Sequence, residues 1–186
     1  NIALTLDVRL QEVAERAFGA RRGALVAIDP ATGGVLAFVS MPGYDPNLFV
    51  DGIDPSSWDT LNNSPDHPLN NRAIAGVYPP GSTFKPFMAL AALELGKRTQ
   101  RSTINDPGYF VFGDRRFRDS KPGGHGVVDM YKSIVMSSDT YYYMLANDMG
   151  IDAISSFMAR FGFGARTGID ITGEAAGVLP SQEWKF

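Results

Sequence analysis

The sequence predicts an α+β fold, and the arrangement of its apolar segments is the main reason. Two short β-rich runs, residues 24–28 and 35–40, flank a turn-forming stretch that contains Asp29, Pro30 and two adjacent glycines, which is typical of an antiparallel hairpin. Segments with helical spacing of apolar residues precede and follow this hairpin. Because two strands alone form a poor sheet, we expect the fold to need more strands than these 186 residues supply.

The helical segments are recognised by apolar residues that recur with the period of a helix. They cover five ranges, about 7–18, 82–95, 127–135, 139–149 and 152–160. Asp7 is the expected N-cap of the first helix and Gly19 its end, while Gly96 ends the second. Asp152 is the expected N-cap of the last helix, which Gly162 closes.

The segments between these elements have the composition of loops. Residues 42–81 are rich in Pro, Asn, Asp and Ser, and a segment this long without regular structure is unusual in a compact domain. We therefore expect a functional loop region that carries short helices. Residues 97–125 are expected to form loops or short strands, and residues 168–184 to form turns.

Composition excludes several classes of protein. Hydrophobic residues make up 44% of the chain and charged residues 20%, which argues against a disordered chain. The formal net charge of −3 argues against electrostatic binding of nucleic acid. The absence of cysteine excludes disulfides, thiolate zinc sites and cysteine nucleophiles. No apolar run approaches the roughly 18 residues that a membrane span needs.

The stretch YPPGSTFKP, residues 78–86, is the strongest functional signal. Two prolines and a glycine prevent the helix from starting earlier, so Ser82 opens it and Lys85 lies one turn along the same face. A serine hydroxyl needs an adjacent base to act as a nucleophile, and a partly desolvated lysine near a helix N-terminus can serve as that base. The alternative is that Ser82 only caps the helix.

Several motifs together resemble the transpeptidase domain of class B penicillin-binding proteins. YPPGSTFKP follows LNNRAIAGV and the hairpin segment DPATGGVLAFVSMPGYDPN, in the order of that family. The chain is most similar to the elongation-type subfamily, penicillin-binding protein 2, on account of DPGYF, FRDSKPGGHG, SSDTYYYMLANDMGID and FGFGARTGIDITGE. The resemblance covers essentially the whole chain. It implies the fold shared with serine β-lactamases, an antiparallel sheet flanked by helices, with a helical subdomain that holds a second motif.

The resemblance also implies a reaction, the cross-linking of peptidoglycan by a D,D-transpeptidase. Ser82 would attack the carbonyl of a stem peptide ending in D-Ala-D-Ala, with Lys85 as the base for acylation. β-Lactam antibiotics would acylate the same serine. The chemistry would require no metal or organic cofactor.

The second motif of the family, Ser-x-Asn or Ser-x-Asp, corresponds to Ser137, Ser138 and Asp139, just before the aromatic segment TYYYMLA. By resemblance, Ser137 would relay a proton between Lys85 and the leaving amine, and Asp139 would orient Lys85 or the substrate. The alternative is a Ser-Asp pair that only caps a helix, since both residue types are favoured at N-caps.

The third motif of the family, Lys-Thr-Gly or Lys-Ser-Gly, does not occur in residues 1–186. We therefore expect residues 1–186 to be the N-terminal portion of a transpeptidase domain, without the third motif and the C-terminal strands. In the family this motif contributes to the oxyanion hole and the carboxylate site. We accordingly expect this portion alone to lack normal acylation.

A candidate metal site lies in the glycine-rich region between the first two motifs. Asp106, Asp119 and His125 offer oxygen and imidazole ligands that could hold zinc. By resemblance, some elongation-type members carry a metal there, with a cysteine beside the second motif as fourth ligand, whereas this chain has Ser138 at that place. The alternative is a solvated loop with a hydrogen-bonded histidine.

Two other functions share parts of this pattern. A serine β-lactamase or a β-lactam sensor domain would use the same Ser-x-x-Lys arrangement, although no deacylating glutamate is evident near the second motif. A non-catalytic scaffold for cell-wall assembly is the other alternative. The resemblance itself implies a periplasmic domain of a protein anchored in the bacterial inner membrane, the anchor being absent here, with a glycosyltransferase of the elongation complex as partner.

Overall fold

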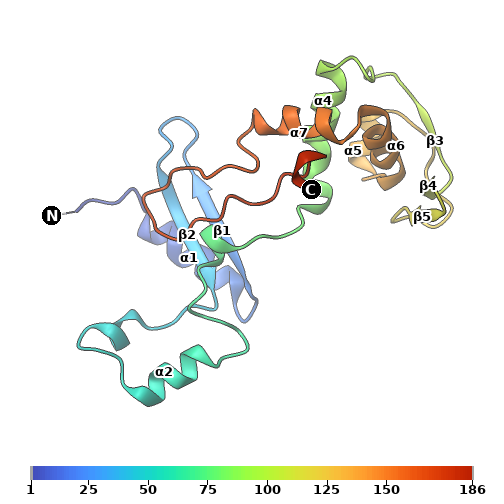
Figure 1. Ribbon diagram of the computed structural model, residues 1–186. Coiled ribbons are helices and arrows are strands. Elements are labelled where there is room, and N and C mark those ends of the chain that lie inside the picture. The colour runs from blue at the N-terminus through green and yellow to red at the C-terminus, as the bar shows by residue number, and fades with distance from the viewer. Residues whose placement is uncertain (1, 186) are drawn as a thin grey trace. The chain divides into compact units, whose positions relative to one another are not determined.

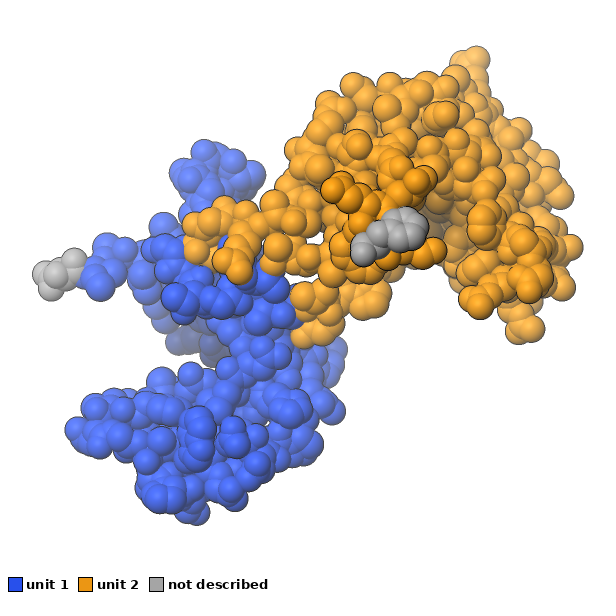
Figure 2. Space-filling view, viewed as in Figure 1, with its two compact units in different colours: residues 1–76, 170–175 blue, residues 77–169, 176–186 orange. Residues whose placement is uncertain are grey.

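The computed structural model describes residues 2–185, and the chain divides into two compact units (Figure 1, Figure 2). Unit 1 comprises residues 1–76 and 170–175, and unit 2 comprises residues 77–169 and 176–186. Among residues 2–185, none of the helices has the length and the apolar character that crossing a membrane requires. The residues of the Ser-x-x-Lys stretch and of the second motif all belong to unit 2.

Unit 1 begins with helix α1 (Val8–Phe18), as the sequence predicted. Asp7 caps it by accepting hydrogen bonds from the backbone N–H groups of Arg9 and Leu10, and Gly19 ends it with a φ of 55°. The helix packs against strand β2 (Val35–Met41), and Ala14 is its buried residue.

The predicted hairpin is confirmed, with β1 (Gly23–Ile28) antiparallel to β2. Its turn is closed by Asp29, whose carboxylate accepts hydrogen bonds from the backbone of Ala31 and the hydroxyl of Thr32. The outer edge of β2 is also occupied. The side-chain amide of Gln11 both donates to and accepts from the backbone of Phe38, at 3.0 and 2.8 Å, and the backbone N–H of Asp7 donates to the carbonyl of Leu36.

The long polar segment after the hairpin carries short helices, as expected: η1 (Pro46–Phe49), α2 (Pro55–Asn62) and α3 (Arg72–Ala75). Arg72 organises the loop between the last two. Its side chain is buried and donates hydrogen bonds to the backbone carbonyls of Asp66, His67 and Asn70. A buried guanidinium with several carbonyl partners fixes a loop that has few apolar residues of its own.

Unit 2 is built around four helices, α4 (Lys85–Glu94), α5 (Met130–Val135), α6 (Asp139–Met149) and α7 (Ile151–Ala159), with a short turn η3 (Glu183–Lys185) near the end. The buried core of this unit consists mainly of side chains from these helices, among them Met88, Ala91, Tyr141, Leu145, Phe157 and Met158. The predicted helix over 82–95 begins differently: a 3₁₀ turn, η2 (Gly81–Phe84), precedes α4, and Pro86 stands in the first turn of α4, where its missing N–H costs nothing.

Four short strands complete unit 2: β3 (Ile104–Asp106), β4 (Tyr109–Phe112), β5 (Arg115–Arg118) and β6 (Gly126–Val128). β3 pairs with β6 and β4 with β5, both antiparallel, so residues 2–185 form three separate two-stranded sheets. The predicted helix over 127–135 was wrong at its start. Two valines there pair with β3, and Asp129 then caps α5 through the N–H of Lys132.

Candidate active site

Ser82 lies in the turn that leads into α4. It is the second residue of η2, and its side chain is exposed. Neither η2 nor α4 receives a capping hydrogen bond from a side chain. The alternative in which Ser82 only caps the helix is therefore wrong, and its hydroxyl is available to other partners.

The hydroxyl of Ser82 is linked to Lys85 through Ser137. Ser137 Oγ donates a hydrogen bond to Ser82 Oγ at 2.9 Å, and Lys85 Nζ donates to Ser137 Oγ at 3.0 Å. Among the described residues no direct hydrogen bond joins Ser82 and Lys85, although their spacing had suggested Lys85 as the adjacent base. The structure instead gives a continuous path of two hydrogen bonds from the lysine to the serine.

The reason is that the second motif takes all three donors of the ammonium group. Lys85 Nζ also donates to the backbone carbonyl of Ser137 and to Asp139 Oδ1, each at 2.6 Å. An ammonium has three N–H donors, and these contacts use all of them. The Lys85 side chain is 10% exposed and the Asp139 side chain 28%, so the ion pair is largely shielded from water. The ring of Tyr142 lies 5.7 Å from Nζ, in the range of a cation–π contact.

The second motif both caps α6 and contacts Lys85. Ser138 is the N-cap of α6, accepting a hydrogen bond from the N–H of Tyr141 at 3.2 Å. Its neighbours Ser137 and Asp139 face Lys85 instead. The helix-cap alternative thus applies to the middle residue of the motif, and the two outer residues contact the lysine.

A pocket of about 480 Å³ opens beside these side chains. Ser82, Lys85 and Asp139 are its polar members, and the rest of its wall is mostly apolar, formed by Phe84, Met88, Tyr142, Tyr143, Ala146, Ile151, Ile154, Leu179 and Pro180. From the sequence alone, the aromatic run of α6 was given no role at the site and the tail was assigned to turns. Only the position of the run, directly after the second motif, could have indicated that part of it lines the site.

The tyrosines of this run are held in their neutral form. Burial raises the pKa of Tyr142, although a hydrogen bond donated by Ser133 partly offsets this rise. Burial also raises the pKa of Tyr143, and the negative charge of Asp139 adds to the effect. The wall of the pocket therefore presents uncharged phenols next to the one ion pair.

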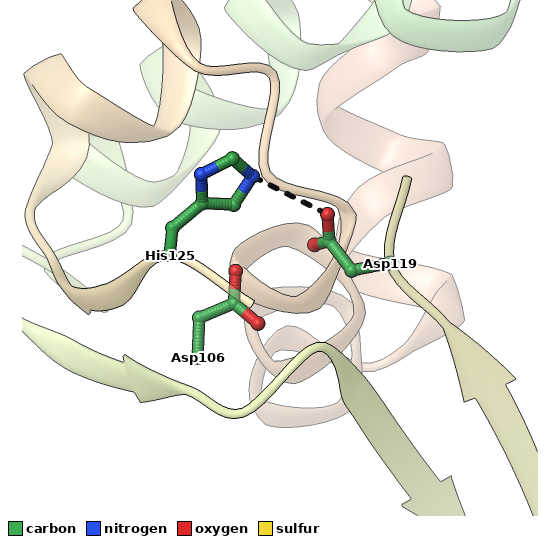
Figure 3. A group of neighbouring side chains, drawn as sticks. All are labelled: Asp106, Asp119 and His125. Carbon is green, nitrogen blue, oxygen red and sulfur yellow. Dashed lines mark ion pairs between the residues drawn. The ribbon is translucent and has the colours of Figure 1, made fainter. Parts of the chain in front are cut away.

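The three candidate metal ligands come together at a second place in unit 2 (Figure 3). Asp106 ends β3, Asp119 follows β5, and His125 precedes β6, and one ligand atom from each lies within 4.8 Å of the others. Gly124 makes this approach possible, because a side chain at that position would collide with the backbone of Asp106. Figure 3 shows the carboxylates and the imidazole converging.

The donor set fits a metal ion better than it fits a solvated loop. The His125 side chain is only 4% exposed, and neither of its ring nitrogens has a hydrogen-bond partner among the described residues. Its Nε2 lies 3.4 Å from Asp119 Oδ1. Burial opposes the ionisation of Asp119, but hydrogen bonds from the backbone N–H groups of Thr140 and Lys121 outweigh it and hold the pKa of this carboxyl well below its usual range. A buried imidazole without partners beside an ionised carboxylate is a suitable zinc ligand set.

Comparison with known protein families supports the resemblance inferred from the motifs. The family model for the penicillin-binding protein transpeptidase domain matches residues 23–186. The peptidoglycan D,D-transpeptidase MrdA of Acinetobacter baumannii is 51% identical over the whole chain. The chain spans 28% of the length of that relative.

Solved structures agree with this result. Penicillin-binding protein 2 of Pseudomonas aeruginosa, in complex with WCK 5153, is 51% identical and superimposes with a TM-score of 0.95 over 99% of this chain and 42% of that one. Penicillin-binding protein A of Mycobacterium tuberculosis, as a ceftriaxone acyl-enzyme complex, is 31% identical, with a TM-score of 0.83 over 92% of this chain and 41% of that one.

Proposed function

Because the chain belongs to the penicillin-binding protein transpeptidase family and has its fold, we propose that it forms the nucleophile-bearing part of a peptidoglycan D,D-transpeptidase. One observation carries the proposal: the hydrogen-bonded path from Lys85 through Ser137 to Ser82. A serine with a relayed base, exposed beside a pocket, is equipped for acyl transfer.

In the proposed acylation step, Ser82 Oγ attacks the carbonyl carbon of the penultimate D-alanine of a stem peptide. The step requires Lys85 as the neutral amine and the Ser137 hydroxyl turned toward it. The proton of Ser82 then passes to Ser137 Oγ, whose own proton passes to the Lys85 amine. The C–N bond then breaks, the released D-alanine takes a proton back along the same path, and an ester to Ser82 remains. The amine of a neighbouring stem peptide attacks this ester, gives up a proton to the path, and restores the serine hydroxyl.

Asp139 serves the path by fixing the lysine. Its carboxylate lies 2.6 Å from Lys85 Nζ, so it determines where the nitrogen stands relative to Ser137. The ion pair also balances the charge of a lysine that the apolar pocket wall would otherwise disfavour.

The contacts of the site favour this reaction over the alternatives. A degenerate scaffold has no need for a complete hydrogen-bonded path from lysine to serine. A β-lactamase needs a group that activates water against the acyl-enzyme, and Asp139, already bound to Lys85, is the only carboxylate among the described residues that line the pocket. We therefore expect a long-lived penicilloyl adduct.

We also propose that Asp106, Asp119 and His125 hold a zinc ion. The ion would have a structural role, because the cluster joins the loop before β6 to the start of α6. The acyl-transfer steps do not involve the ion. The support is the buried imidazole without hydrogen-bond partners and the ionised Asp119.

The setting of the protein is proposed from its family. The substrate would be peptidoglycan stem peptides ending in D-Ala-D-Ala, with β-lactams acting on the same serine. Such substrates lie outside the cytoplasmic membrane. We therefore propose that this domain works in the periplasm and belongs to a protein anchored in the inner membrane. A glycosyltransferase that makes the glycan strands would be the natural partner for cell elongation and shape.

The decisive test is labelling of the full-length protein with a fluorescent penicillin, followed by mass spectrometry of the labelled peptide. We expect the label on Ser82 and its loss in Ser82→Ala. Ser156→Ala, which removes an exposed serine on α7, is the matched control and should label normally. A label that persists in Ser82→Ala would show that another residue is the nucleophile.

A further inference from the structure

The residues of the second motif point alternately to two different places. Ser137 and Asp139 contact Lys85, whereas Ser138 and Thr140 contact the buried carboxylates of Asp106 and Asp119. The start of α6 is therefore held between the reacting groups on one side and the carboxylate cluster on the other.

Ser138 is the centre of the second set of contacts. It is completely buried, and its Oγ lies 3.0 Å from Asp106 Oδ2 and 3.3 Å from Asp119 Oδ2, to either of which it can donate its one proton. The same oxygen accepts the N–H of Tyr141. An N-cap needs only the last of these contacts, so the hydrogen bonds to the carboxylates require a further explanation.

The backbone of Ser137 indicates what those contacts resist. Its φ is 53°, in the left-handed region that residues other than glycine, asparagine and aspartate rarely occupy. A serine stays in that region only when its surroundings determine it. The N–H groups of Ser137 and Ser138 donate to the carbonyls of Ile134 and Ser133 on one side, and the Ser138 side chain is anchored on the other.

We propose that Ser138 is a positioning residue of the acylation machinery. Its hydroxyl, anchored on Asp106 and Asp119, keeps Ser137 in the left-handed conformation that places Ser137 Oγ between Ser82 and Lys85. In the described part of the chain Ser138 makes no hydrogen bond to Ser82 or Lys85, so it would act through its neighbour Ser137. The inference rests on the proposed function, since it assigns a role within that reaction.

Three substitutions separate anchoring from capping. Ser138→Ala removes both contacts, whereas Ser138→Gly removes the anchor but remains a tolerable N-cap. Ser138→Thr keeps a hydroxyl that can anchor and cap. Asp54→Ala removes the side-chain cap of α2 in unit 1 and controls for a loss of stability of similar origin. All variants are made in the full-length protein and compared at a temperature where urea unfolding shows that each is folded.

The measurement is the rate of penicillin labelling as a function of penicillin concentration, which separates the binding constant from the acylation rate constant. We expect the acylation rate constant to fall about 10- to 100-fold in both Ser138→Ala and Ser138→Gly, with the binding constant within about 2-fold of the wild type. Ser138→Thr should recover most of the rate, and Asp54→Ala should acylate as the wild type does. A rate that follows stability across all variants, or that is unchanged in Ser138→Gly, would overturn the inference.

Three further outcomes are distinguishable. Recovery of acylation in Ser138→Ala on addition of zinc would overturn the inference, because the hydroxyl would then act as a metal ligand. A wild-type protein that takes no label at all would overturn the proposed function and this inference with it. Normal labelling of the wild type beside equally fast labelling of Ser138→Ala would overturn the inference alone.

Discussion

Ser137 donates a hydrogen bond of 2.9 Å from its Oγ to the Oγ of Ser82, across 55 positions of the sequence. This bond makes Ser137 the intermediate between the nucleophile and Lys85, which the same hydroxyl contacts at 3.0 Å. Lys85 therefore acts on Ser82 through the hydroxyl of Ser137. The reaction depends on the positions of both the η2 turn and the second motif.

Removal of the bridging hydroxyl in Ser137→Ala should lower the acylation rate constant for penicillin by about 10²- to 10⁴-fold, the range of general acid–base contributions. Binding of penicillin before acylation should change little, because the pocket wall is untouched. Stopped-flow labelling of the full-length protein measures both constants. Unaltered acylation in Ser137→Ala would mean that Lys85 reaches Ser82 by another route.

The Lys85–Asp139 pair should show the asymmetry of a buried ion pair. Asp139→Ala leaves the ammonium without its carboxylate and should destabilise the protein by about 3 kcal/mol. The double variant Lys85→Met, Asp139→Ala should be more stable than Asp139→Ala alone, because it removes the uncompensated charge. The double-mutant cycle compares the wild type, Lys85→Met, Asp139→Ala and the double variant by urea unfolding. Purely additive changes in the free energy of unfolding would show that the two groups do not interact.

Stability at high pH should depend on Tyr142. Because burial raises the pKa of this phenol in the folded protein, the unfolded chain loses the proton first. The associated stability is complete below the ordinary tyrosine pKa of about 10 and is lost as the pH rises toward the higher folded value. We expect the free energy of unfolding to fall more steeply above about pH 10 in the wild type than in Tyr142→Phe.

The exposed Tyr131 provides the matched control, as Tyr131→Phe makes the same chemical change at the surface. Urea unfolding at a series of pH values measures the slopes. Equal slopes in the wild type and Tyr142→Phe would contradict the effect of burial.

The metal proposal predicts that the purified protein holds about one zinc ion per chain at Asp106, Asp119 and His125. Chelation should lower its melting temperature, and zinc should restore it. His125→Ala should lose the metal, whereas His67→Ala removes the other of the two histidines of the chain and should retain it. Elemental analysis decides the point, and equal zinc content in both variants would exclude the site.

Sequence patterns predicted most of the secondary structure because the signals are local. The Asp29 turn with its paired glycines, the Asp7 cap and the apolar period of α6 each act within a few residues. Val127 and Val128 were misassigned to a helix because their preference is decided by pairing with β3, more than 20 positions away. That pairing depends on how the intervening loop folds, which composition does not reveal.

The residues of the site could be named from motifs, but their connections could not. Spacing placed Ser82 and Lys85 one turn apart, yet Lys85 turns to the second motif because three acceptors meet its three donors there. The role of Ser138 was equally hidden, because its carboxylate partners lie 19 and 32 positions away and approach it only in the folded chain. Proximity between distant segments is the information that a single sequence lacks.

The side-chain amide of Gln11, which takes both backbone groups of Phe38, has a consequence for how unit 1 can associate. A further strand beside β2 would meet backbone groups at Phe38 and Leu36 that are already engaged, whereas within residues 2–185 β1 pairs with no strand except β2. We therefore expect a segment that enlarges this sheet, from the same protein or another, to add next to β1. Helix α1 thus protects the outer edge of β2 from pairing with a further strand, and it favours extension of the sheet on the side of β1.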